Sequence, residues 1–217
     1  MKFTHLIISR INIKWREQAQ DKAWLDNRIN ILNSTLRPSL EGQTNQNFKF
    51  ITLWGYEPIG GISNEYQIKL DAVGAPKIRA EMLPKLAEFI DEDHVLITRV
   101  DSDNCLGDRF VETLHNNIGE NVPFYYDIGK MDMINTATRK KTTWITPKTS
   151  GFVSVMEKSD ELTCIPYKYS HSLIGTHITG MLLDLDVLLT IHGDNLSVKN
   201  NLGKPSDFDV NKYNLSL

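Results

Sequence analysis

Cysteine is scarce in this sequence of 217 residues. Only Cys105 and Cys164 occur, with no CxxC pair and no spacing typical of a metal-binding cysteine cluster. This scarcity excludes a disulfide-dense secreted scaffold and a zinc finger. It favours two reduced structural thiols in a cytoplasmic protein.

An excess of charge of one sign is also missing. The net charge is −3 and the pI is about 6.1, so the chain lacks the electrostatic footprint of a nucleic-acid-binding protein. The one basic cluster, Arg139-Lys140-Lys141, is short. We expect it at a solvated hairpin tip rather than in a phosphate-binding patch.

Long apolar runs and glycine motifs are absent as well. The first apolar run, Leu6 to Ile8, is too short for a signal core or a spanning helix, so we expect no membrane span. No GxxxxGKS, GxxxxGKT, GxGxxG or GxSxG motif occurs. A nucleotide would therefore not be held by a glycine loop. The hydrophobic fraction of 41% and charged fraction of 24% are ordinary for a soluble globular protein, and the length fits one domain.

Strands and helices alternate over the first half of the chain. The predicted elements are a strand at 3–12, a helix at 21–36, a strand at 48–55, a helix at 77–89, a strand at 94–100 and a helix at 106–118. In the first helix, an apolar stripe is spaced four, three and four residues apart, and Pro38 is expected to end it. This order predicts an α/β fold with a largely parallel sheet.

The pattern changes in the second half. Short aromatic and β-branched segments at 122–129, 131–138 and 141–147 predict a small antiparallel meander. Residues 150–158 predict a helix capped by Ser150 or Thr149. Two further predictions are a strand within 160–169 and, at 180–193, either a strand or a buried helix, which periodicity does not distinguish. The polar residues from Asp194 onward predict a mobile tail or a lid.

Two carboxylates stand on alternate residues at the end of the strand "HVLITRV". Ligands gather at the carboxyl ends of parallel strands, and Asp101 and Asp103 are hard oxygen ligands suited to Mg²⁺ or Mn²⁺. The alternative is that they cap the next helix and complement its dipole. The spacing leaves both interpretations open for this pair. For Asp108, expected in the first turn of that helix, we favour the cap. A dehalogenase-type phosphatase with an Asp-x-Asp motif is a rival interpretation.

Several blocks resemble, in order, the rhamnosyltransferase family of GT-A-type glycosyltransferases. These are "HLIISRIN", "AWLDNRINILNSTLRPSLEGQTNQNFKFITLW", "LITRVDSDN", "SGFVSVME" and "LLTIHGDNLSVKN". The resemblance implies a GT-A-like fold in one domain, 1–217. Residues 1–120 would form the nucleotide-sugar-binding half, 121–192 the acceptor-side half and 193–217 a polar tail or lid.

The same resemblance implies site residues. Asp103 resembles the aspartate that ligates a divalent metal, Mn²⁺ or Mg²⁺. Asp101 resembles the one that contacts ribose or metal-bound water, and His192 the late histidine that completes the metal site. Residues expected to face the nucleotide are Arg10, Asn12, Arg28, Arg99 and Asp101, with Lys199 and Lys204 in the tail. Because Arg99 and Asp101 are two residues apart, they share a strand face.

The implied reaction transfers a sugar, rhamnose by the family's name, from a nucleoside-diphosphate sugar to a hydroxyl of a saccharide or other acceptor. The metal would neutralise charge on the leaving diphosphate, and a base would take the acceptor's proton. The candidates for the base are Asp127, Asp132, Glu157 and His171. Two other functions stay open, a metal-dependent phosphohydrolase and a non-catalytic carbohydrate-binding protein.

Overall fold

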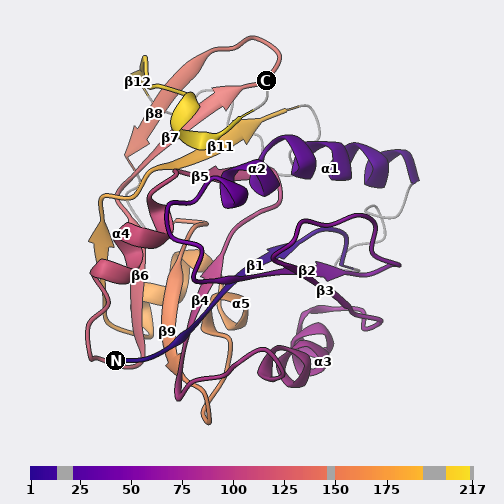
Figure 1. The fold of residues 1–217 in the computed structure, drawn as a ribbon, viewed down its shortest axis with the longest axis vertical. Helices are drawn as coiled ribbons and strands as arrows, with labels where there is room; N and C mark the ends of the chain where they lie inside the picture. The colour runs from indigo at the N-terminus through magenta and orange to yellow at the C-terminus, as the bar shows by residue number, and fades with distance from the viewer. Residues whose placement is uncertain (14–21, 146–149, 193–203, 216–217) are drawn as a thin grey trace.

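A seven-stranded sheet forms the centre of the molecule, in the order β10-β6-β9-β4-β1-β2-β3 (Figure 1). The computed structural model describes residues 1–13, 22–145, 150–192 and 204–215. The strands of this sheet are β1 (Thr4–Arg10), β2 (Lys49–Trp54), β3 (Glu65–Lys69), β4 (His94–Arg99), β6 (Phe124–Ile128), β9 (Ser154–Lys158) and β10 (Gly180–Leu183). The four strands β3, β2, β1 and β4 are parallel, β9 is antiparallel to both its neighbours, and β10 is parallel to β6.

Helices cover both faces of this sheet. They are α1 (Lys22–Ser34), α2 (Leu36–Glu41), α3 (Ala75–Ala87), α4 (Phe110–Asn116) and α5 (Ile165–Lys168), and two short 3-10 turns are η2 (His171–Thr176) and η3 (Asn211–Tyr213). Ile7 of β1 packs with residues of α1, α2 and α4, whereas Leu6 and Ile8 pack with residues of α3. In Figure 1, α1 and α2 lie above the ribbon of β1 and α3 lies below it. Burial on both faces is typical of parallel strands.

A second sheet has the order β12-β8-β7-β11-β5. Its strands are β5 (Asn104–Leu106), β7 (Lys130–Asn135), β8 (Lys141–Ile145), β11 (Val187–Ile191) and β12 (Lys204–Pro205). The C-terminal segment is fixed to this sheet by Tyr213, which is fully buried. The Tyr213 hydroxyl lies 2.8 Å from a carboxylate oxygen of Asp132 and 3.2 Å from the carbonyl of Val187.

The mixed α/β architecture with a mostly parallel sheet confirms the predicted fold class. Both cysteines are free and buried, and burial raises the pKa of each thiol. Within the described ranges, no helix is long and apolar enough to span a membrane.

The first half departs from prediction at two places. The strand β3 was not predicted, so the Asp-x-Asp pair follows the fourth strand of the chain rather than the third. Pro38 does not end a helix. The break falls at Thr35, which has non-helical dihedral angles, and Pro38 lies in the first turn of α2. Proline is tolerated there because the first N–H groups of a helix have no partner within the helix.

The predicted helix at 150–158 is wrong, since these residues contain β9. Residues 152 to 157 are all buried, because β9 lies between β4 and β6 with both faces covered. A strand of this kind shows no alternation by which to distinguish it from a buried helix. The predicted strand within 160–169 is also wrong, because α5 lies there. The open choice at 180–193 resolves into two strands, β10 and β11.

The predicted antiparallel meander is correct only in part. Strands β7 and β8 pair antiparallel, but β6 belongs to the large sheet. Asp108 is not in the first turn of a helix, because α4 starts at Phe110 with Arg109 as its N-cap.

Candidate functional site

Two parallel strands end side by side at the carboxyl edge of the large sheet. In the pairing of β1 with β4, Ile8 lies opposite Arg99. Since alternate residues share a face, Arg10 and Arg99 point to the same side. The Arg10 Nη2 atom lies 3.4 Å from Asp101 Oδ1, and the Arg99 Nη2 atom lies 3.9 Å from the same oxygen. The Asp101 side chain is 40% exposed, which leaves room for a ligand.

Asp103 contacts side chains from two distant parts of the chain. Arg28 of α1 donates from Nη1 to Asp103 Oδ2 over 2.9 Å, and His192 Nε2 lies 3.2 Å from the same oxygen. All three side chains are at most 14% exposed. Burial alone would raise the pKa of the Asp103 carboxyl, but the His192 contact and the Arg28 charge outweigh it and lower the pKa. The carboxylate therefore stays ionised although it is buried.

Tyr167 of α5 completes the cluster on the side of Arg10 and Arg99. The guanidinium carbons of these arginines lie 5.7 and 5.5 Å from the centroid of the Tyr167 ring. The Tyr167 hydroxyl donates to the carbonyl of Ile8 over 2.8 Å. Sequence reasoning missed this residue, since a tyrosine in a short helix carries no signal for such a contact.

Buried side-chain polar atoms without a hydrogen-bond partner concentrate at this edge. Within the part of the chain that the structure describes, they are Ser9 Oγ, Asn12 Nδ2, Arg28 Nε, Arg99 Nε, Ser102 Oγ and Asn104 Oδ1. They lie at or just after the end of β1, at the end of β4, between β4 and the first residue of β5, or on the arginine that pairs with Asp103. Such atoms cost about 1–3 kcal/mol each when unsatisfied. Their concentration is typical of a site that a polar ligand completes.

The donor set can be compared with what a divalent metal needs. Ligands on adjacent corners of an octahedron with bonds of about 2.1 Å lie about 3 Å apart, and Asp103 Oδ2 and His192 Nε2 meet this spacing. No cluster of three or more metal-binding side chains occurs among the described residues. The pair fits a cation that takes its other ligands from phosphate and water, as Mg²⁺ commonly does. A cation at this pair would compete with Arg28 for the carboxylate.

Asp127 lies at the same edge of the sheet. Tyr126 pairs with Ser154, and Ser154 pairs with Thr98, so Asp127 is level with Arg99 two strands away. Its carboxylate is fully buried. It accepts hydrogen bonds from the backbone N–H of Ser150 over 2.7 Å, from the Ser150 hydroxyl and from the backbone of Ile128.

Glu157 lies away from this edge and on a strand, not on the helix that the sequence predicted. It pairs with Val95 near the start of β4, roughly 20 Å of extended chain from Asp101. Its carboxylate accepts hydrogen bonds from the backbone and hydroxyl of Thr163 and from the backbone N–H of Ile165. Glu157 thus fixes the segment that leads into α5.

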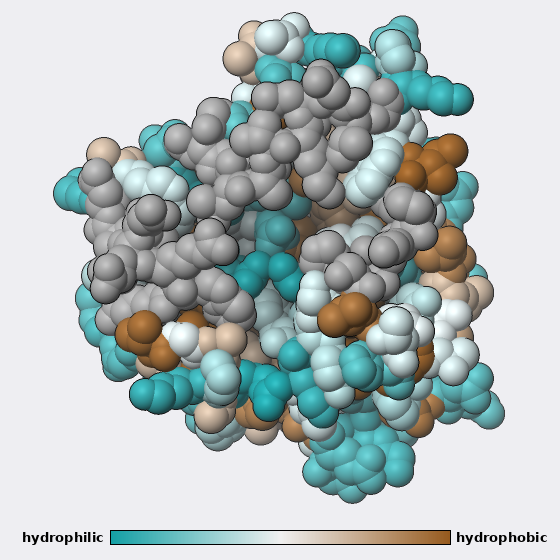
Figure 2. Space-filling view, turned by 180° about the vertical axis from the view of Figure 1, so that it is seen from behind, coloured by the Kyte–Doolittle hydropathy of each residue, from teal (hydrophilic) through white to brown (hydrophobic). Residues whose placement is uncertain are grey.

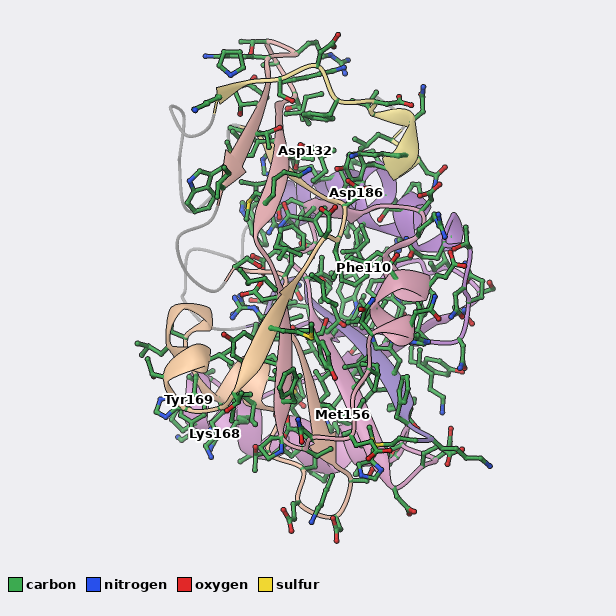
Figure 3. All side chains as sticks on the ribbon, turned by 90° about the vertical axis from the view of Figure 1, so that its left-hand side faces the viewer. Phe110, Asp132, Met156, Lys168, Tyr169 and Asp186 are labelled. Atoms are coloured by element: carbon green, nitrogen blue, oxygen red, sulfur yellow. The ribbon has the colours of Figure 1, made fainter. Side chains whose placement is uncertain are left out.

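Asp132 belongs to a different network, on the small sheet. It accepts hydrogen bonds from the Thr143 and Tyr213 hydroxyls, both over 2.8 Å, and Lys212 Nζ lies 3.1 Å from it. Figure 3 shows Asp132 near Asp186 in this part of the molecule. These contacts tie the C-terminal segment to the sheet.

The remaining predicted residues are placed as follows. Asn12 is buried, and its side-chain oxygen accepts a hydrogen bond from the backbone of Gly55 over 2.9 Å. His171 lies in η2, and its side chain is outside what the structure describes. Lys199 and most of the predicted lid lie outside the described residues, while Lys204 is exposed in β12.

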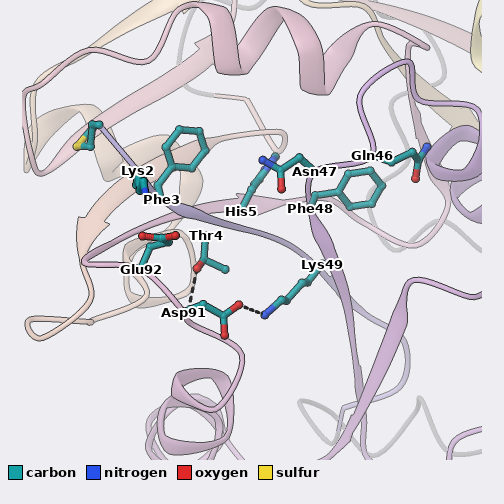
Figure 4. Close-up of a pocket in the computed structure, with 11 residues that line it drawn as sticks. Lys2, Phe3, Thr4, His5, Gln46, Asn47, Phe48, Lys49, Asp91 and Glu92 are labelled. Atoms are coloured by element: carbon teal, nitrogen blue, oxygen red, sulfur yellow. Dashed lines mark hydrogen bonds and ion pairs between the residues drawn. The ribbon is translucent and has the colours of Figure 1, made fainter.

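The surface has further hollows. The view from behind shows hydrophilic side chains within a central hollow (Figure 2). A separate pocket of about 500 Å³ lies at the amino ends of β1 and β2, lined by residues 1–5, 46–49, 91 and 92 (Figure 4). Asp101 and Asp103 stand at the opposite edge of the sheet, so this pocket is not part of the cluster around them.

The class of protein follows from the fold together with the family. The mostly parallel α/β sheet, with Asp101 and Asp103 at its carboxyl edge, agrees with the GT-A-like fold that the sequence predicted. The family is shown by the sequence itself, because the family model described as "Putative rhamnosyl transferase" matches residues 12–204. The chain belongs to this family, which sets aside the phosphohydrolase interpretation.

Other comparisons found more distant similarity. No curated protein matched the chain. Staphylococcus aureus TarS 1-349 in complex with UDP is 11% identical, with a TM-score of 0.48 over 87% of this chain and 60% of that chain. Francisella tularensis 2-C-methyl-D-erythritol 4-phosphate cytidylyltransferase is 12% identical, with a TM-score of 0.41 over 84% of this chain and 90% of that one. This chain thus spans less than two thirds of the TarS structure's length.

Proposed function

We propose that this protein is a metal-dependent glycosyltransferase that transfers a sugar, rhamnose by the description of its family, from a nucleoside-diphosphate sugar to an acceptor hydroxyl. One observation carries the proposal. Asp103 and His192, 89 residues apart in the chain, meet at 3.2 Å at the carboxyl edge of the parallel strands. The atoms that would hold a cation are therefore together before any ligand binds.

Asp103 and His192 would hold the divalent metal, Mn²⁺ or Mg²⁺. When bound, the metal would neutralise the charge that develops on the leaving diphosphate. Arg28 would keep the Asp103 carboxylate ionised and oriented in the absence of the metal, since its guanidinium lies 2.9 Å away. Because Arg28 contacts the Asp103 oxygen that the metal would bind, its guanidinium would move toward a phosphate of the donor when the metal binds.

Three guanidinium groups lie around two carboxylates at this edge, which favours an anionic ligand. Arg10 and Arg99 would bind the diphosphate of the donor. Asn12, with an unpaired and buried Nδ2 atom, would donate to the nucleoside part. Asp101, the more exposed carboxylate, would accept from a ribose hydroxyl or from metal-bound water.

The proton of the acceptor hydroxyl needs a base. We keep Asp127 and His171 as candidates and leave Glu157 out, because Glu157 stands at the other end of β4 with its carboxylate hydrogen-bonded to the chain before α5. Asp127 is at the right edge but buried. It would act only if the segment at Ser150 moved from its carboxylate.

Thermal-shift measurements with nucleoside diphosphates, with and without Mn²⁺, test the proposal. Stabilisation by one nucleotide that requires Mn²⁺ is expected, since a ligand stabilises the state that binds it. If no nucleoside diphosphate of the panel raises the melting temperature, the proposal is overturned. If one does so equally with and without Mn²⁺, the proposed metal dependence is wrong.

A turnover assay then separates an enzyme from a carbohydrate-binding protein on the same fold. Release of nucleoside diphosphate from a nucleotide-rhamnose donor should depend on Asp103. Binding of the donor without turnover, over a range of saccharide acceptors, would favour the non-catalytic function.

A further inference from the structure

One aromatic ring contacts both arginines at the carboxyl edge. The ring of Tyr167 lies within 5.7 Å of the guanidinium carbons of Arg10 and Arg99. A cation within about 6 Å of an aromatic ring is attracted by the ring's quadrupole, more strongly where water is excluded. The side chain of Arg99 is 12% exposed and that of Arg10 is 25% exposed. Both contacts are thus largely shielded from water.

The ring is fixed from two directions by groups other than the arginines. Its hydroxyl donates to the Ile8 carbonyl, which also accepts the backbone N–H of Val100 over 3.1 Å. This ties the ring to the junction of β1 and β4. The start of α5 is tied to β9 by Glu157, whose carboxylate accepts from the backbone N–H of Ile165 over 2.7 Å. The scaffold therefore sets the position of the ring.

An aromatic ring suits this place for an electrostatic reason. Two guanidinium groups that share Asp101 Oδ1 repel each other at short range. A second carboxylate would attract both guanidinium groups, but its negative charge would also offset the positive potential that they present to an anion. A ring attracts both cations and carries no net charge, so their positive charge still acts on an incoming anion.

We propose that Tyr167 is a positioning residue that holds the guanidinium groups of Arg10 and Arg99 in the geometry in which they bind the donor's diphosphate. This inference rests on the proposed function, which assigns a diphosphate to these arginines. It adds a residue that touches no substrate itself. It also gives the buried Glu157 a role, as the anchor of the segment that carries the ring.

Calorimetric titration of inorganic pyrophosphate in the presence of Mg²⁺ tests the inference. Tyr167→Leu, which removes the ring, should weaken binding about tenfold, equivalent to about 1.4 kcal/mol. Tyr167→Phe keeps the ring, which the contact of Glu157 with the start of α5 still holds in place, and loses only the hydrogen bond to Ile8, so its binding should stay within about twofold of wild type. Melting temperatures of both variants show whether they are folded, and Tyr167→Met replaces the leucine variant if that one does not fold.

A double-mutant cycle shows whether Tyr167 acts through the arginines. In an Arg10→Gln/Arg99→Gln background, Tyr167→Leu should cause no further loss beyond about twofold, because the groups it positions are gone. A further tenfold loss there would overturn the inference.

The remaining outcomes separate the inference from the proposed function. If wild type binds pyrophosphate and Tyr167→Leu binds it equally well, the inference fails and the proposed function stands. If Tyr167→Phe is as weak as Tyr167→Leu, the hydroxyl rather than the ring matters, and the inference also fails. If wild type binds neither pyrophosphate nor any nucleoside diphosphate, the proposed function fails and the inference with it; if it binds only a nucleoside diphosphate, the same variants are compared with that ligand.

Discussion

Replacing Asp103 by asparagine removes a negative charge from between two largely buried partners, Arg28 and His192. Arg28 would keep its charge at 14% exposure without the carboxylate that now lies 2.9 Å away. Hydrogen bonds to charged groups contribute about 1.5–3 kcal/mol, and asparagine retains one acceptor oxygen. We therefore expect Asp103→Asn to lower the free energy of unfolding by about 2–3 kcal/mol. At about 2–4 °C per kcal/mol for a chain of this size, the melting temperature should fall by about 4–12 °C.

The assay combines urea unfolding of the apo protein with calorimetry of nucleotide plus Mn²⁺. Asp101→Asn is the matched control, since its carboxylate is 40% exposed and its contacts are 3.4 and 3.9 Å long. This control should cost less than about 1 kcal/mol. An Asp103→Asn protein as stable as wild type would refute the argument from the buried ion pair. Undiminished Mn²⁺-dependent affinity would separately remove Asp103 from the metal site.

Three further predictions concern single side chains. Burial lowers the pKa of His115 to about 4, and burial together with the neighbouring His115 lowers that of His5. The unfolded chain therefore binds more protons below about pH 6.5, so stability should fall between about pH 6.5 and 4. For His115, which is partly exposed, the free energy of unfolding should fall by about 1–2 kcal/mol over this pH range. Measured by urea unfolding, it should depend less on pH in His115→Gln than in wild type. A pH dependence equal to that of wild type would contradict the assignment of this loss to His115. His192→Ala should abolish stabilisation by Mn²⁺ plus nucleotide in thermal-shift measurements while costing the apo protein less than about 1 kcal/mol, since Asp103 keeps Arg28. Asp108→Asn should change stability by no more than about 1 kcal/mol and leave turnover intact, because Asp108 precedes the N-cap of α4; loss of turnover at constant melting temperature would show that its carboxylate serves the site.

The sequence predicted the structure correctly where a pattern of residues was compatible with only one interpretation. Alternating strands and amphipathic helices over the first 118 residues predicted the parallel part of the sheet, and carboxylates directly after β4 predicted the edge at which polar groups gather. Local patterns failed where an element is covered on all sides. Strand β9 is one such element; its burial removes the periodicity that distinguishes a strand from a helix.

The sequence by itself determined the fold class, the family and the acidic pair at a strand end, because these follow from short-range periodicity and from motifs in contiguous blocks. Tertiary structure alone decided which distant groups meet. His192 contacts Asp103 although 89 residues separate them in the chain. The Tyr167 ring lies near the guanidinium of Arg10 because it is carried by α5, whose start is hydrogen-bonded to Glu157. No local propensity encodes such contacts, since they depend on strand order and on the register of β4 between β1 and β9. That register places Asp127 at the carboxyl edge and Glu157 at the opposite one.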